Sequence, residues 1–143
     1  MRRSLLAIAL GITFLIVMTW IGTLIANIVP HRPTAQVQTA QAGPYSVTLE
    51  VDPNPPPITS PATLSFQVTL ASSQAPIDDA TVVLENSMTT MDMGTDREQA
   101  QHQGSGLYRA HVQFSMSGPW QVLALISRPG SPSASVTFDV TAQ

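Results

Sequence analysis

The sequence predicts an all-β domain, a two-layer β-sandwich, preceded by one N-terminal transmembrane helix. Two observations predict this fold class. Residues 5–29 form a run of 25 uncharged and mostly apolar residues. From residue 45 onward, apolar side chains instead recur at every second position, which is the period of a half-buried strand. No segment between these later runs has the spacing of an amphipathic helix.

The uncharged run is long enough to cross a bilayer at about 1.5 Å per helical residue. Apolar regions of secretory signals are shorter, about 7–15 residues, so residues 1–29 are predicted to be an uncleaved signal anchor. The triplet Ala40-Gln41-Ala42 resembles a signal-peptidase site and supports cleavage as the alternative, although it lies far beyond the run. Arg2 and Arg3 precede the run, which favours a cytoplasmic N-terminus. We therefore expect a single-pass protein of the cell membrane with an extracytoplasmic C-terminal domain.

Small residues recur on one face of the predicted helix and would let another helix approach closely. They are Ala7, Gly11, Gly22 and Ala26. This face is predicted to pack on a larger membrane protein or on its own copy. The alternative is that glycine and alanine are simply common in membrane helices.

Residues 30–43, "PHRPTAQVQTAQAG", contain prolines and glutamines with few apolar residues. This composition predicts a flexible linker that is extended or disordered.

Alternating runs then fill residues 44–143, and each is bounded by Pro, Gly, Ser or Asp, as strand ends are. The runs cover residues 45–51, 64–70, 82–84, 108–114, 120–126 and 136–140. Six or seven short strands in about 100 residues are typical of an immunoglobulin-like Greek-key β-sandwich.

Composition excludes several classes of function. The chain has no cysteine, and its six basic residues are all arginine, so disulfides, thiol nucleophiles, thiolate metal sites and lysine Schiff bases are excluded. Beyond residue 30, four arginines face nine acidic residues, a net charge of about −5, which disfavours binding to nucleic acid. No nucleophile-elbow motif is present, and we expect the protein not to be an enzyme.

Methionines cluster in "SMTTMDMG", which contains Met88, Met91 and Met93. Met88 is in phase with the strand before it, and Met116 is in phase with residues 108–114, so both are predicted to point into the core. Met91 and Met93 follow the strand among Thr, Asp and Gly, which predicts a loop. A thioether is a soft ligand that prefers Cu(I), so these methionines are candidate copper ligands. The alternative is that flexible methionines fill gaps between the loops of the sandwich.

Two histidines could add an imidazole when copper is oxidised. His111 is expected to face outward from its strand, and His102 lies in the preceding loop. His111 is therefore a candidate metal ligand. A solvent-exposed histidine without a metal is the alternative.

The segment "SMTTMDMG" followed by "GSGLYRAHVQFSMSGPWQVLALI" resembles the YtkA-like domain, and the whole layout resembles the related FixH family. The shared features are the methionine segment, Gly106 with Tyr108, and Met116 with Gly118 and Trp120. The resemblance implies an immunoglobulin-like sandwich on the outer face of a membrane, with copper as its cofactor and haem-copper oxidase assembly as its setting. It carries the metal-ligand role onto Met88, Met91, Met93 and Met116.

Two functions from different classes follow. The first is a membrane-tethered module that binds or delivers copper through the methionine-rich loop. The second is a non-catalytic accessory subunit of a larger membrane complex, docked through its transmembrane helix. Exposed Met91 and Met93 side chains whose sulfurs converge favour the first function. Burial of all four methionines among Trp120, Phe114 and Leu84 favours the second.

Overall fold

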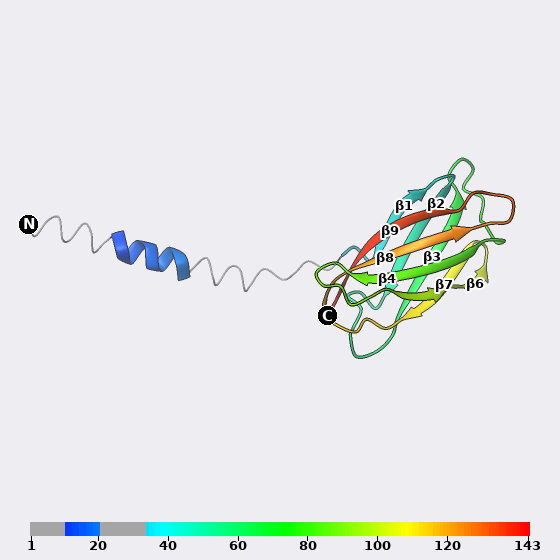
Figure 1. Ribbon diagram of the computed structural model, residues 1–143. Helices are drawn as coiled ribbons and strands as arrows, with labels where there is room; N and C mark the ends of the chain where they lie inside the picture. Colours follow the sequence, from blue (N-terminus) through cyan, green and yellow to red (C-terminus); the bar gives the residue numbers. More distant parts are fainter. Residues whose placement is uncertain (1–10, 21–33) are drawn as a thin grey trace, which may run out of the picture. The chain divides into compact units, whose positions relative to one another are not determined.

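The computed structural model describes residues 11–20 and 34–143 (Figure 1). The chain divides into two compact units, residues 1–32 and 33–143. In the first unit, residues 11–20 are helical and all ten are exposed. Among the residues that the structure describes, no helix has the length and hydropathy needed to cross a membrane. Most of the predicted anchor, including Ala7, Gly22 and Ala26, lies outside the described residues.

The second unit is an all-β sandwich of two antiparallel sheets, as the alternating runs predict. Across residues 34–143 there are nine strands: β1 (Val37–Ala42), β2 (Tyr45–Asp52), β3 (Ala62–Leu70), β4 (Thr81–Met88), β5 (Asp96–Gln99), β6 (Gln101–Gly104), β7 (Leu107–Val112), β8 (Gly118–Ser127) and β9 (Ala134–Ala142). One sheet has the order β1-β2-β3-β7-β6 and the other has the order β5-β4-β8-β9.

The core lies between the sheets and consists of the side chains at every second position of the long strands. In β2 and β8, for example, buried residues alternate with residues that are more exposed. Phe66 on β3 meets Phe138 on β9 across the layer, with ring centroids 6.2 Å apart. All buried core residues of the described chain belong to this unit, so the sandwich carries its own hydrophobic core.

Both sides of the sandwich are bridged. On one side the chain passes from β5 in one sheet to β6 in the other through Ala100, whose N–H donates to the carbonyl of Val82 at 2.9 Å. On the other side, Gln38 Nε2 of β1 donates to the carbonyl of Asp139 on β9 at 2.7 Å. The two sheets are thus held together at both lateral edges as well as through the core.

The prediction of a flexible linker over residues 30–43 is wrong for residues 37–42. These form β1, which pairs with β2 along its whole length. The strand lies at the edge of its sheet and buries only Ala42 among its six residues. It therefore lacks the apolar alternation by which the inner strands are identified. Residues 30–33 lie outside the described part of the chain.

The sandwich has two ends with different loops. The first, which we call the Thr34 end, consists of Thr34, Gln143 and the loops 53–61, 89–95 and 113–117. Thr34 is fixed there because its hydroxyl accepts the N–H of Thr141 at 3.2 Å and its carbonyl accepts Asn54 Nδ2 at 2.8 Å. The other, which we call the Arg128 end, consists of residues 43–44, 71–80, 105–106 and 128–133. The methionine-rich loop belongs to the Thr34 end.

Candidate metal site

The four candidate methionines divide into one buried and three exposed side chains. Met88 is the last residue of β4, lies opposite Trp120 and is 9% exposed, so the inward orientation predicted for it is confirmed. Met91 and Met93 are each 50% exposed in the loop after β4, as predicted. Met116 is 37% exposed. Three thioethers at the Thr34 end therefore reach solvent.

The prediction that Met116 points into the core is wrong. β7 ends at Val112, so the strand alternation no longer applies four residues later. Phe114 still enters the core, where its ring packs against Trp120 with centroids 5.4 Å apart. Met116 contributes its backbone instead, because its carbonyl accepts the indole N–H of Trp120 at 3.0 Å. Its side chain is left facing outward.

The loops that carry the methionines are neighbours. The N–H of Thr89, at the start of one loop, donates to the carbonyl of Pro119 at 3.1 Å, just after the other loop. The side chain of Met88 passes over Gly118, where a Cβ atom would lie 2.7 Å from the methionine Cε. Gly118 also has a φ of 136°, a conformation that disfavours other residues. A glycine at this position allows β4 and the loop before β8 to approach this closely.

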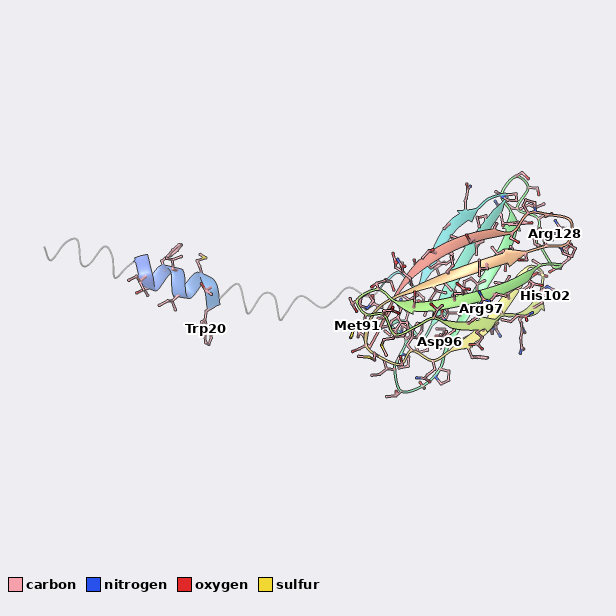
Figure 2. The ribbon with its side chains drawn as sticks, viewed as in Figure 1. Trp20, Met91, Asp96, Arg97, His102 and Arg128 are labelled. Carbon is pink, nitrogen blue, oxygen red and sulfur yellow. The ribbon has the colours of Figure 1, made fainter. Side chains whose placement is uncertain are left out.

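The methionine-rich loop surrounds an open hollow of about 320 Å³. The backbone bends around Met93, where the carboxylate of Asp92 accepts the N–H of Gly94 at 3.2 Å in an Asx turn. The hollow is lined by Ser87, Met88, Thr89, Thr90, Met91, Asp92, Gly94 and Thr95. Figure 2 shows Met91 at this end of the sandwich. Met88 and Met91 thus share one hollow, with Met93 in the same loop.

The donor atoms at this end fit a soft metal ion. Thioether sulfur binds Cu(I) well and harder cations poorly. Within residues 11–20 and 34–143, no three His, Asp or Glu side chains are grouped as they would be around a harder cation. Met88, Met91, Met93 and Met116 are therefore the residues that could hold copper here.

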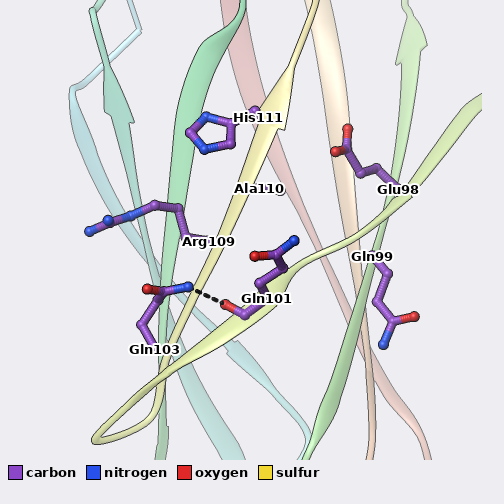
Figure 3. Close-up of a pocket in the computed structure, with 7 residues that line it drawn as sticks. All are labelled: Glu98, Gln99, Gln101, Gln103, Arg109, Ala110 and His111. Atoms are coloured by element: carbon purple, nitrogen blue, oxygen red, sulfur yellow. Dashed lines mark hydrogen bonds between the residues drawn. The ribbon is translucent and has the colours of Figure 1, made fainter.

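His111 lies in a different hollow. It is exposed on β7, as predicted, and its Nδ1 atom is 3.2 Å from the hydroxyl of Thr63 on β3. The hollow beside it has a volume of about 50 Å³ and is lined by Glu98, Gln99, Gln101, Gln103, Arg109, Ala110 and His111 (Figure 3). The structure does not bring His111 into the hollow that Met88 and Met91 line.

His102 is held in an acidic network at the Arg128 end. Its Nε2 atom is 2.8 Å from Asp78 Oδ1, which also accepts the N–H of Gly106 at 2.5 Å. These two partners stabilise the carboxylate and lower the pKa of Asp78, the Gly106 N–H having the larger effect. Sequence patterns do not predict this network, because His102 and Gly106 lie 24 and 28 residues from Asp78 in the chain.

Tyr108 supports the same region from inside. Its hydroxyl donates to the carbonyl of Ile77 at 2.8 Å and accepts the N–H of Ala80 at 3.2 Å. Burial raises the pKa of Tyr108, so the phenol remains a neutral donor. Beside it, Asp79 pairs with Arg128 at 2.6 Å and raises the pKa of that guanidinium. The adjacent carboxylates of Asp78 and Asp79 are thus both paired, with His102 and Arg128 respectively.

Comparison with known proteins gives one informative match. No curated protein matches the chain. Among solved structures, a crystal structure of an engineered protein aligns with a TM-score of 0.46 and 15% sequence identity, over 76% of this chain and 21% of that chain. That likeness is too slight to support any conclusion.

The family match covers most of the sandwich, from within β1 to within β8. The model of the YtkA-like family matches residues 39–124, which begin within β1 and include all four candidate methionines. The match spans more than half of the chain and agrees with the resemblance seen in the methionine segment and in "GSGLY". The chain belongs to the YtkA-like family.

Proposed function

We propose that this protein is a membrane-tethered, extracytoplasmic module that binds Cu(I) through methionine thioethers and delivers it to an acceptor. The exposure of Met91, Met93 and Met116 carries the proposal. Methionines that only fill gaps between loops would be buried, whereas these side chains present sulfur to solvent from two adjacent loops. Within residues 34–143 of this cysteine-free chain, they are the exposed soft donors that an incoming Cu(I) ion can reach.

The arrangement suits delivery as well as binding. Met88 and Met91 line the open hollow. Met93 and Met116 are exposed at the same end of the sandwich. A site that is open to solvent leaves the bound ion accessible to ligands from an acceptor. Neutral thioethers also require no proton release when the ion binds or leaves. The acceptor class implied by the resemblance to FixH-type proteins is a haem-copper oxidase during its assembly.

The fold and the helix support the tethered part of the proposal. The order β2-β3-β7-β6 facing β5-β4-β8-β9 corresponds to an immunoglobulin-like Greek key, with β1 added at one edge. In residues 11–20, the side chains of Phe14, Leu15 and Ile16 are 61%, 66% and 58% exposed, and such an apolar surface suits a lipid environment. The 25-residue uncharged run around them supplies the length for a span.

An anaerobic Cu(I) competition titration of residues 33–143 tests the copper site. This fragment contains β1 and the complete core. We expect one equivalent of Cu(I) to bind, and the double variant Met91→Leu, Met93→Leu to weaken binding at least tenfold, because leucine keeps the bulk and removes the sulfur. Thr90→Val is the matched control, since it changes the same hollow without removing a thioether. Parent and double variant binding Cu(I) equally would disprove the site.

A second candidate function is a non-catalytic accessory subunit that docks through its helix. Gly11 favours it, because a small, exposed residue on a helix lets a neighbouring helix approach closely. In that case the native chain should migrate within a larger membrane complex that the Gly11→Leu variant fails to enter. Identical migration of both chains would argue against docking through this face.

A further inference from the structure

Apolar exposure on the sandwich is confined to one end. Within residues 34–143, the large hydrophobic side chains that are exposed all lie at the Thr34 end: Val37, Ile58, Met91, Met93 and Met116. Val37 is the first residue of β1 and Ile58 lies in the loop 53–61, which is joined to the loop 113–117 where Gln113 Nε2 donates to the carbonyl of Ile58 at 2.6 Å. These five residues form what we call the apolar end patch.

The Arg128 end has the opposite character. Its loops carry the Asp78–His102 and Asp79–Arg128 pairs. Figure 2 shows Arg128 and His102 well separated from Met91 along the length of the sandwich. A polar, ion-paired end and an apolar end therefore face in opposite directions.

The chain enters the sandwich at the apolar end. Thr34 is bonded there to Asn54 and Thr141. Val29, the last residue of the uncharged run, precedes Thr34 by five positions in the sequence. A fully extended chain covers at most about 3.6 Å per residue, so this segment spans no more than about 18 Å. The ten-residue strand β8, by comparison, is about 33 Å long.

We propose that the apolar end patch docks on the surface of the lipid bilayer, a proposal that rests on the membrane anchor of the proposed function. The short connection holds this end near the bilayer, and exposed methionine and isoleucine side chains are suited to enter the interfacial region. Asp52, Asp92 and Asp96 are exposed at the same end, so the contact favours zwitterionic lipids over anionic ones. The methionine-rich loop would then exchange copper at the membrane surface, with an acceptor site that lies at that level.

The absence of cysteine allows a direct test with the full chain in phosphatidylcholine vesicles. Single-cysteine variants Thr95→Cys, in the methionine-rich loop, and Ser72→Cys, at the Arg128 end, are labelled with a fluorophore. The quencher is a spin label attached to the lipid headgroup. We expect the Thr95→Cys label to be quenched severalfold more than the Ser72→Cys label. Equal quenching, or stronger quenching at Ser72→Cys, would overturn the proposal.

Two further measurements distinguish docking by the apolar end patch from the effect of the tether alone and from the presence of the membrane anchor. Adding Val37→Asn and Ile58→Asn should lower quenching at Thr95→Cys by at least twofold while leaving Cu(I) affinity unchanged, because no thioether is altered. Unchanged quenching would mean that the tether alone sets the distance, and docking would be refuted. Failure of the chain to float with vesicles would refute the anchor and the docking together, whereas the Cu(I) titration stands or falls independently of both.

Discussion

At the scale of single residues, Gly106 has a tightly constrained position between β6 and β7. Its φ is 73°, and a Cβ atom there would lie 2.5 Å from the carbonyl oxygen of Val68. Its own carbonyl accepts the N–H of Val68 at 2.8 Å, and its N–H is bonded to Asp78. The residue therefore joins β3, the turn before β7 and the acidic network at the Arg128 end.

Gly106→Ala is expected to destabilise the sandwich by about 2 kcal/mol more than Gly104→Ala does. Gly104 also has a positive φ, of 96°, but a Cβ atom there meets nothing within 4 Å. The pair therefore separates the clash with Val68 from backbone strain that both variants share. Urea unfolding of residues 33–143 gives the two free energies. Equal losses would show that the neighbouring backbone moves aside at little cost.

Asp78 predicts how stability depends on acid pH. Because its pKa is lowered in the folded protein, it contributes stability above its unfolded pKa, and this contribution is lost as the pH falls through the folded pKa. Between about pH 5 and pH 3, the parent should therefore lose more unfolding free energy than Asp78→Asn, which has no proton to take up. Urea unfolding at a series of pH values measures both slopes. Parallel slopes would contradict the stabilising role of the Gly106 and His102 contacts.

At the scale of elements, β1 determines where the folded domain begins. The strand covers one edge of β2, and its Gln38 side chain joins that edge to β9. Without β1, the backbone groups of β2 would form an open edge that can pair with another chain. Residues 37–42 are therefore part of the sandwich and not of a spacer before it.

A fragment that starts at Gly43 is expected to be less stable than residues 33–143 by about 2 kcal/mol or more and to self-associate. The reason is the loss of the β1–β2 ladder and of the buried side chain of Ala42. Urea unfolding measures the first effect, and size-exclusion chromatography over a range of concentrations measures the second. Gln38→Ala within the longer fragment provides an intermediate case, with an expected loss of about 1 kcal/mol. If both fragments were monomeric and equally stable, β1 would contribute neither to the stability of the sandwich nor to the protection of its edge.

The strands that the sequence predicts are the ones that fill the core. β2, β3, β4, β7, β8 and β9 were predictable because each buries every second residue. β5 is exposed along its whole length, and β6 is almost as exposed, so "DREQ" and "QHQG" carry no apolar signal. Only Ala100 between them is buried. The edge strands β5 and β6, unlike the edge strand β9, are specified by backbone pairing rather than by side-chain burial, and sequence periodicity does not record that pairing.

Strand alternation also explains which methionine positions were predicted correctly and which were not. Met91 and Met93 were placed in a loop because they follow a strand among turn residues, and that placement is confirmed. Met116 was misplaced because alternation was carried beyond the end of β7. The nearness of the two methionine-bearing loops depends on the pairing of β4 with β8, which joins residues far apart in the chain. Tertiary pairing of this kind has no local signature.

At the scale of the whole molecule, the proposed copper site predicts a linkage between metal and stability. A ligand that binds only the folded state stabilises it by about 2.7 kcal/mol at a free concentration one hundred times its Kd. At that free Cu(I) concentration the unfolding free energy of the parent should therefore rise by this amount. That of the Met91→Leu, Met93→Leu variant, whose site is at least tenfold weaker, should rise by no more than about 1.4 kcal/mol. Anaerobic urea unfolding with and without Cu(I) makes the comparison. Equal stabilisation of both proteins would place copper elsewhere on the chain.

The contrast between buried Met88 and the three exposed methionines also has a consequence for oxidative damage. Oxidants convert accessible methionine to its sulfoxide, which is polar and no longer offers a soft sulfur lone pair. Within the sandwich, Met91, Met93 and Met116 would be oxidised first, whereas Met88 is nearly buried beside Gly118 and Trp120. Since these residues contribute little to the core, the sandwich would remain folded, while the copper binding and the bilayer docking that we propose for this surface would be lost. Oxidised molecules would therefore give the same results as the parent in measurements of folding but would lack the proposed function, until reduction of the sulfoxides restored the thioethers.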